Sequence, residues 1–237
     1  NTKDGKIEDT KQGQTGDCYL LSAISALSYN EKGAQMIKDC LEYDDKGTTV
    51  HLKGVGDYYV SNDEVAQTKG SDQYSNGDDD MIIFELAVEK VRNDMANGDA
   101  YYLDDDKSES IGNGFVEMTS STKDAPSIAN GGLATEVLYY ITGKTADLVY
   151  NKEDITQALD NFQQNNGKDY CASVGLYNDT IAISPQGETI ELYGPHAYSI
   201  KNVSDNTVTI TNPWDSSKDL IIQKENFIEV IDDMEIL

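Results

Sequence analysis

The stretch QGQTGDCYLLSAISAL, residues 12 to 27, places a polar, glycine-containing turn directly before an apolar segment, with Cys18 at the junction. Apolar residues recur after the cysteine at helical spacing, which predicts a helix whose first turn holds Cys18. Asp17 is a suitable N-cap residue for this helix. A cysteine in this position is either a buried core residue or a nucleophile that the turn presents, so the rest of the sequence must decide.

The chain has 237 residues, which is enough to bury a large core in one domain or in two lobes. Its three cysteines, Cys18, Cys40 and Cys171, are an odd number in a chain of this length. A framework of disulfides is therefore not expected, and at least one thiol should be free.

The composition is strongly acidic, with 43 Asp and Glu against 18 Lys and Arg and a net charge of −25 at pH 7. Such a charge repels nucleic acids and anionic membranes and attracts cationic substrates or divalent cations. No apolar run reaches the roughly 20 residues needed to span a bilayer, so no membrane insertion is expected. Arg92 is the sole arginine, a bias that favours a low-GC bacterial source. We expect a secreted or cell-surface protein, with a cytoplasmic location as the alternative.

Secondary-structure patterns divide the chain near residue 145. Before it, helical periodicity predicts a helix over 84 to 95 that Gly98 stops and a short helix in 135 to 144 that Gly143 ends, and alternation predicts a hairpin from 48 to 61. Residues 99 to 130 are mostly polar and predict a long loop. After it come one more helix near 155 to 162 and then the alternating runs CASVGLY, TIAIS, ETIELY, HAYSIKNV, TVTITN and DLIIQ, which are typical of an antiparallel sheet.

Several kinds of chemistry are excluded by their missing motifs. The three cysteines are widely separated and no CxxC or HxxxH spacing occurs, so a structural zinc site is not expected. The stretch GQTGDC lacks the GK[ST] ending of a phosphate-binding loop, and no GxSxG nucleophile elbow is present. Cysteine with histidine chemistry is what remains.

Cysteine catalysis needs a thiolate, a histidine and a group that orients the histidine. The helix N-terminus at Cys18 favours a thiolate, but the charge of Asp17 opposes it, so an ion pair with a histidine would be needed. Of the two histidines, His51 is expected to be a solvated strand residue, whereas His196 begins a strand after the turn YGP. Asn212 on the next strand is placed to orient His196. An oxyanion donor is also needed, and spacing leaves both Gln12 and Gln14 open.

These motifs resemble those of the calpain family of papain-clan cysteine peptidases. QGQTGDCYLL is similar to the family's Q-G-x-x-G-D-C-W signature, while GPHAYSI and TNPWD are similar to its G-H-A-Y-S and N-P-W-G segments, in the family's order. Weaker similarity extends over most of the chain, in ANGGLATEVLYYITGK, FELAVEKV and GDYYVSNDE.

The resemblance implies a role for each matching residue. It makes Cys18 the nucleophile, His196 the general base and then the general acid, and Asn212 the residue that orients the imidazole. It also makes Gln12, six residues before the cysteine, the oxyanion donor rather than Gln14, and Trp214 the aromatic residue that shields the histidine and asparagine.

The resemblance further implies that Gly131 and Gly132 meet an extended substrate through their backbone, although a flexible turn is an equal alternative. It implies calcium as an activator that takes no part in the chemistry. Asp9 would be a ligand, together with nearby carbonyls and an acidic residue from the loop around Asp78 to Asp80, and oxygen ligands suit this ion. The alternative for Asp9 is a plain solvated acid.

Three residues depart from the family pattern: Tyr19 stands in place of Trp, Pro195 precedes His196 in place of Gly, and Asp215 follows Trp214 in place of Gly. We expect these to reshape substrate subsites without removing the chemistry. The chain ends soon after TNPWD, so calcium control is expected to be partial or different.

From these features we predict an α+β, papain-like cysteine protease of two lobes. Residues 1–145 would form the helical lobe with the nucleophile, and residues 146–237 the antiparallel β-rich lobe with the histidine and asparagine. The expected function is a monomeric endopeptidase that hydrolyses polypeptides through a thioester and needs no cofactor for its chemistry. The alternatives are a transglutaminase-type acyl transferase and a binding module without catalysis.

Overall fold

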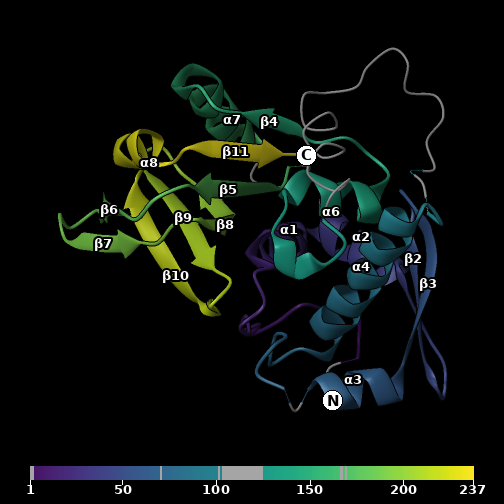
Figure 1. Ribbon diagram of the computed structural model, residues 1–237. Helices are drawn as coiled ribbons and strands as arrows, with labels where there is room; N and C mark the ends of the chain where they lie inside the picture. Colours follow the sequence, from purple (N-terminus) through teal and green to yellow (C-terminus); the bar gives the residue numbers. More distant parts are fainter. Residues whose placement is uncertain (1–2, 70, 101, 103–124, 166–167, 169) are drawn as a thin grey trace.

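The computed structural model describes residues 3–69, 71–100, 102, 125–165, 168 and 170–237 (Figure 1). These residues form a mixed α/β structure with antiparallel sheets. Residues 101 and 103–124 of the loop predicted from 99 to 130 lie outside the described residues. The helices are α1 (Cys18–Ser28), α2 (Glu31–Asp39), α3 (Asn62–Thr68), α4 (Asp79–Asn97), the 3-10 helix η1 (Ile128–Asn130), α6 (Ala134–Thr142), α7 (Lys152–Gln164) and α8 (Lys224–Val230).

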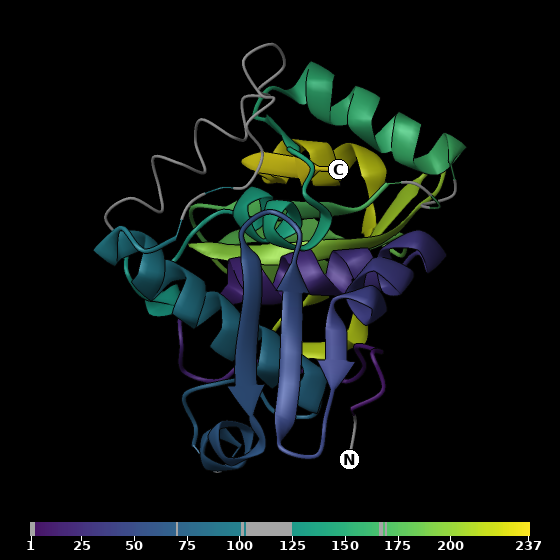
Figure 2. The same cartoon turned by 90° about the vertical axis from the view of Figure 1, so that its right-hand side faces the viewer.

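Helix α1 is the central element of the structure. It lies between the three-stranded sheet and the six-stranded sheet, as the two views show (Figures 1 and 2). All residues from Tyr19 to Leu27 are buried, including two serines. The polar groups of buried Ser22 have hydrogen-bond partners. Its hydroxyl lies 2.7 Å from the Ser173 hydroxyl, and its carbonyl accepts a hydrogen bond of 2.9 Å from Ser199. The helix is therefore held on its β side by polar contacts as well as by packing.

The first sheet contains β1 (Leu41–Tyr43), β2 (Gly47–Leu52) and β3 (Gly56–Ser61) in the order β1-β2-β3. Strands β2 and β3 pair antiparallel with His51 opposite Asp57, which confirms the predicted hairpin. The sequence patterns did not point to α2 or to β1. Strand β1 has only three residues and helix α2 only nine, which is too short for a clear period.

Helices α4 and α6 end as predicted at glycines in the left-handed conformation. Gly98 has φ 77° after α4, and Gly143 has φ 69° after α6. The two helices are joined by a buried ion pair in which Arg92 of α4 donates to both carboxylate oxygens of Glu136, at 2.8 and 2.6 Å. This is a bidentate pair of fully buried side chains, the arrangement in which removing one partner costs most.

The second sheet has six strands in the order β10-β9-β8-β5-β11-β4, and all of its pairs are antiparallel. A separate hairpin joins β6 to β7. The six predicted strand runs are all present, while β4, β11 and α8 were not predicted. The strands are β4 (Asp147–Val149), β5 (Ala172–Leu176), β6 (Thr180–Ile183), β7 (Thr189–Leu192), β8 (His196–Val203), β9 (Thr207–Asn212), β10 (Asp215–Gln223) and β11 (Asp233–Ile236).

Buried apolar side chains form two clusters. One surrounds α1, α4 and α6 and draws almost all of its members from the first 146 residues, with Cys171 and Ala197 as the later ones. The other lies between the six-stranded sheet and helices α7 and α8, and its members run from Ile155 to Met234. Ala197 is the point at which β8 reaches into the first cluster.

Glu235 forms a polar link between the two parts of the chain. It lies on β11, is 4% exposed, and accepts a hydrogen bond of 2.5 Å from the backbone N–H of Thr135 in α6. Burial raises the pKa of Glu235 from 4.5 to about 7, while the hydrogen bond from Thr135 opposes that rise. The folded chain therefore holds a proton on Glu235 that the unfolded chain releases at lower pH.

We expect this proton to make stability depend on pH. Because the folded-state pKa lies above the unfolded value, the contribution is complete below pH 4.5 and is lost as pH rises through about 7. Glu235→Gln should remove this part of the slope, on the order of 1–3 kcal/mol between those limits. The free energy of urea unfolding, measured from pH 4.5 to 8, tests this. Exposed Glu153 provides the control Glu153→Gln, and an unchanged slope in Glu235→Gln would contradict the prediction.

Candidate active site

His196 and Asn212 meet at one end of two neighbouring strands. Strand β8 begins at His196 and strand β9 ends at Asn212, and the two strands pair antiparallel. The imidazole Nε2 lies 2.8 Å from Asn212 Oδ1, so Nε2 carries the proton and Nδ1 is the ring nitrogen left to accept one. His196 is 7% exposed. This is the geometry expected of an amide that fixes the orientation of an imidazole.

Trp214 covers this pair from the outside. Its ring centroid lies 4.6 Å from that of His196, and its backbone N–H donates to Asn212 Oδ1 at 3.0 Å. Tyr193, between β7 and β8, packs against Trp214 at 5.0 Å between ring centroids. Trp214 remains 47% exposed, so it covers the polar pair on one side while its outer face is open to solvent.

Cys18 lies beside the end of β8 that carries His196, because α1 packs against β8. Its thiol is half-buried and is in hydrogen-bond contact with the backbone of Ala197, the residue that follows His196. Tyr198, the next residue, also lies close enough for the charge of Cys18 to affect it. The structure thus brings together Cys18, His196 and Asn212, which are separated by up to 194 positions in the chain.

Burial acts against both charges of a thiolate and imidazolium pair. It raises the pKa of Cys18, with the Asp17 charge adding to the rise and the Ala197 backbone opposing it. Burial also lowers the pKa of His196, against the hydrogen bond with Asn212. Burial thus disfavours the charged form of each group, and the ion pair expected from the sequence stays a prediction.

Gln12 lies next to the end of β9, but its backbone and side-chain N–H groups already donate hydrogen bonds. Its backbone N–H donates to the Pro213 carbonyl at 2.8 Å, which fixes the turn against the strand end. Its side-chain Nε2 donates to Thr15 O at 2.8 Å and to Asp17 Oδ1 at 3.1 Å. An oxyanion at Cys18 would have to share one of these hydrogens. Gln14, the other glutamine of the turn, is exposed.

Asp17 occupies the N-cap position that the sequence predicts, but its side chain does not cap the helix. No hydrogen bond runs from its carboxylate to the first turn of α1, and its backbone angles, φ −113° and ψ 24°, are not those of an extended cap residue. The carboxylate instead turns inward to Gln12. The prediction of a side-chain cap was therefore wrong, because the interior of the turn offers this acid a closer donor.

Gly131 and Gly132 lie near the cysteine turn through the loop that holds η1. Arg92 Nη1 donates to the Gly131 carbonyl at 2.7 Å, and Gly131 has φ 77°, which favours glycine. A β-carbon at Gly131 would meet nothing within 4 Å, whereas one at Gly132 would lie 2.3 Å from Arg92 and 2.9 Å from Tyr19. A side chain at Gly131 would therefore enter open space, although the Gly131 N–H already donates to Ile128 O at 3.3 Å, and Gly132 is needed for packing.

The predicted calcium ligands make hydrogen bonds within the chain. Both carboxylate oxygens of Asp78 accept backbone N–H groups, from Asp80 at 2.9 Å and from Glu8 at 2.7 Å. Asp80 accepts from Asp4, Gly5 and the Tyr43 hydroxyl. Asp9 is exposed. In the part of the chain that the structure describes, no three His, Cys, Asp or Glu side chains are grouped to hold a metal. This arrangement does not fit a calcium site formed by Asp9 and the loop from Asp78 to Asp80.

His51 and the other cysteines lie apart from this site. The ring of His51 bonds Asp57 and Glu42 at 2.9 and 3.0 Å near the surface, as a solvated strand residue would. Cys40 and Cys171 are buried, and burial raises the pKa of their thiols to about 11 and about 12. Neither is suited to act as a nucleophile at neutral pH.

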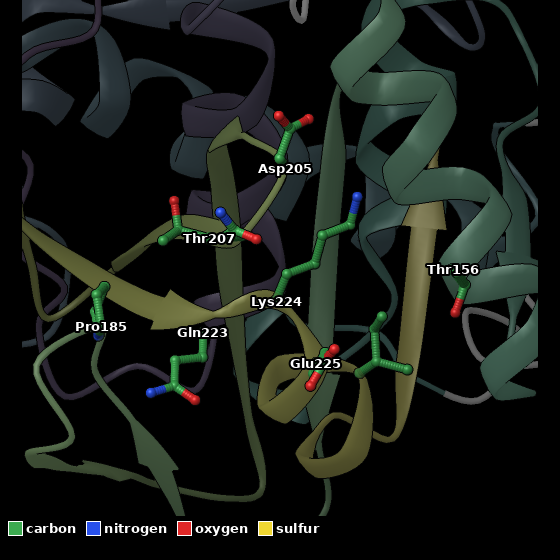
Figure 3. Close-up of a pocket in the computed structure, with 9 residues that line it drawn as sticks. Thr156, Pro185, Asp205, Thr207, Gln223, Lys224 and Glu225 are labelled. Carbon is green, nitrogen blue, oxygen red and sulfur yellow. The ribbon is translucent and has the colours of Figure 1, made fainter.

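A pocket of about 500 Å³ lies between α7 and the start of α8 (Figure 3). Lys224 on its wall is already paired with Asp160 at 2.7 Å. None of Cys18, His196 or Asn212 belongs to its lining. The lining consists of Thr156, Pro185, Asp205, Asn206, Thr207, Gln223, Lys224, Glu225 and Ile228.

Two residues of the site were not found from the sequence. Glu85 contacts Asp17 from α4, and the signal for it was an acid within the apolar run MIIFELAV. Tyr193 supports Trp214, but an aromatic residue at the end of a strand run has too many alternative uses to be singled out. Both depend on contacts between segments that are distant in sequence.

The chain matches no protein-family model and no curated protein sequence. Among the described residues, no helix is long and apolar enough to cross a membrane. The resemblance to calpains therefore remains a prediction that rests on the three motifs.

We expect the thiol of Cys18 to be the one that reacts in the native protein. Iodoacetamide at neutral pH should modify Cys18 alone, whereas the unfolded chain should take up label on all three cysteines. His196→Ala should slow the native reaction, because the imidazole can no longer accept the thiol proton. Mass spectrometry of digested, labelled protein measures this. Label on Cys40 or Cys171 at the rate of Cys18, or an unchanged rate in His196→Ala, would contradict it.

Proposed function

We propose that this protein is a cysteine endopeptidase similar to calpains. The observation that carries the proposal is the hydrogen bond of 2.8 Å between His196 Nε2 and Asn212 Oδ1, next to a half-buried Cys18. Papain-clan chemistry needs these three groups in this relation. Motifs for the same three residues occur in the sequence in the family's order.

A papain-like arrangement of two lobes is part of the proposal. Its support is the division of the buried apolar side chains into two clusters, with α1 in one and the start of β8 at the boundary. In this arrangement the first lobe comprises residues 1–145 and the second residues 146–237. Cys18 and His196 would then face one another across the groove between the lobes.

The reaction starts with proton transfer from Cys18 Sγ to His196 Nδ1 as sulfur attacks the peptide carbonyl. The carbonyl oxygen becomes an oxyanion, which accepts hydrogen bonds from the Cys18 N–H and from Gln12 Nε2. The imidazolium then gives its proton to the leaving amine, and the C–N bond breaks to form a thioester. Water, deprotonated by His196, hydrolyses this thioester and returns the thiol.

The extended substrate is proposed to lie along Gly131, where a β-carbon would meet nothing within 4 Å, and to reach Trp214 on its other side. We expect polypeptide substrates and a monomeric enzyme, from a bacterium that secretes it or displays it on its surface. Calcium as an activator remains a separate proposal, and no step of the reaction passes through it.

Cys18→Ala should abolish peptide hydrolysis, with a loss of at least about 10⁴-fold, because the residual groups cannot form the thioester. The assay is digestion of a peptide library, with new termini identified by mass spectrometry, in the presence of calcium and of a chelator. Circular dichroism and the melting temperature confirm that the variant is folded. Undiminished cleavage by Cys18→Ala would overturn the assignment.

The matched control is Cys171→Ala, which removes a buried thiol outside the site and should keep the activity of the wild type if the variant is folded. Products decide between the enzyme classes. New termini indicate hydrolysis, whereas cross-linked peptides would indicate acyl transfer. If neither product forms and an epoxysuccinyl inhibitor does not label Cys18, the result would indicate a binding module.

A further inference from the structure

Two buried carboxyl groups touch directly behind the turn that carries Cys18. Asp17 precedes α1 and Glu85 lies in the second turn of α4, and both are completely inaccessible to solvent. Their side chains are in hydrogen-bond contact with one another. Two carboxylates that meet inside a protein cannot both be ionised at moderate cost, because their repulsion is not screened. A contact between them therefore requires a proton.

The oxygens of Asp17 show where a proton is needed. Oδ1 accepts the hydrogen bond of 3.1 Å from Gln12 Nε2. Oδ2 is buried and, among the described residues, has no hydrogen-bond donor. A buried acceptor without a donor destabilises the fold by its lost hydration. A protonated Glu85 supplies the missing donor and removes the repulsion between the two acids.

Glu85 is tied to the loop that supports the cysteine turn. Its oxygens accept the Ser75 backbone N–H, at 2.9 and 3.2 Å, and also the Ser75 hydroxyl. The loop that contains Ser75 in turn pairs with the turn before Cys18. Gln14 N–H donates to Asp72 O and Thr15 N–H to Gln73 O, each at 2.8 Å. Glu85 thus contacts the turn through Asp17 and supports it through Ser75.

We propose that Asp17 and Glu85 share one proton, and that this acid pair positions Gln12 and the turn that presents Cys18. Glu85 O–H donates to Asp17 Oδ2, and the remaining negative charge stays on Asp17, whose Oδ1 holds the Gln12 amide. In this arrangement Asp17 and Glu85 are positioning residues that do not touch the substrate. The part of the proposal that concerns Gln12 rests on the proposed function, whereas the shared proton does not.

The surroundings favour this placement of proton and charge. Burial, followed by the charge of Asp17, raises the pKa of Glu85 well above its ordinary value. Burial also raises the pKa of Asp17, to about 6. The hydrogen bond from Gln12 favours the charge on Asp17, which agrees with a proton on Glu85. The other titratable groups near the pair are Glu89 on α4, Tyr74 in the supporting loop, and Cys18 and Tyr19 on α1.

The pair also sets the charge next to the thiol. With one proton between them, the two acids place a single negative charge beside Cys18, where two charges would oppose a thiolate more strongly. That charge is held by the Gln12 amide, so the orientation of Gln12 depends on the ionised state of Asp17. A change at Asp17 should therefore alter both the thiol and the oxyanion donor.

Isosteric amide variants separate these effects. Glu85→Gln keeps an N–H donor to Asp17 and an oxygen acceptor for Ser75, but has no proton to lose. Asp17→Asn keeps one N–H for Glu85 and one oxygen for Gln12, and it moves the charge to Glu85. Glu153→Gln on the exposed face of α7 is the matched control. Circular dichroism and melting temperature establish that each variant is folded.

The shared proton is tested without activity, by the infrared C=O stretch of protonated carboxylic acids at pH 7. We expect a band of the wild type to be lost in both Glu85→Gln and Asp17→Asn, and to be kept in Glu153→Gln. The same band in all four proteins would overturn the shared proton. If one variant fails to fold, the other still decides this point.

The positioning role is tested by alkylation and by kinetics. In Asp17→Asn we expect the pH midpoint of Cys18 alkylation to fall, because the charge moves from the residue next to the thiol to Glu85. We also expect kcat to fall at constant KM, because the neutral amide of Asp17→Asn orients Gln12 less strongly and an oxyanion donor acts in the transition state. Glu85→Gln leaves the single charge on Asp17 and should therefore keep the wild-type midpoint, while the control Glu153→Gln should keep both the midpoint and kcat. An unmoved midpoint in Asp17→Asn, or a higher KM with unchanged kcat, would overturn this role.

A wild-type protein without peptidase activity would contradict the proposed function alone. The infrared band and the alkylation midpoint would then still decide whether the acid pair exists and acts on Cys18.

Discussion

The packing of helix α1 against strand β8 is the contact on which the rest of the site depends. It sets the first residue of the helix beside Ala197, so that the cysteine meets the start of the strand that carries His196. Because α1 is buried along nearly its whole length, its position is fixed by the surrounding elements and by the serine contacts to β5 and β8. A side chain at the start of such a helix has little freedom to move, and this rigidity favours a preorganised site.

The protein combines a very acidic surface with several acids in its interior. Asp17, Asp78, Asp80, Glu85, Glu136 and Glu235 are all buried, and each has a local reason to be there. Glu136 is paired with Arg92, whereas Asp78, Asp80 and Glu235 accept hydrogen bonds from the backbone. Asp17 and Glu85 have each other. Buried carboxylates thus connect segments that are distant in sequence. Most of the hydrogen bonds that they accept come from backbone N–H groups.

The elements that were predicted well are those with a strong local signal. The helix after Cys18, the hairpin from 48 to 61 and the glycines at 98 and 143 all follow from periodicity and from the left-handed residues that end helices. Helix α2, strand β4 and strand β11 are short, and their partners are distant in sequence, so no local pattern marks them. The side chain of Asp17 shows the same limit, since its residue type favoured a cap while its actual partners lie in a loop and on another helix.

By itself, the sequence determined which residues could carry chemistry: a cysteine at a helix start, one histidine and one asparagine at strand ends, and a tryptophan close behind. Residue type and local spacing are enough for that, because they do not depend on how the chain folds back. Only the tertiary structure decided that His196 bonds Asn212, that Gln12 is held by Asp17, and that Glu85 touches Asp17. These contacts join segments up to 68 positions apart, from Asp17 to Glu85, and arise from packing between elements. Burial then sets the charges at the site, and burial is a property of the folded chain alone.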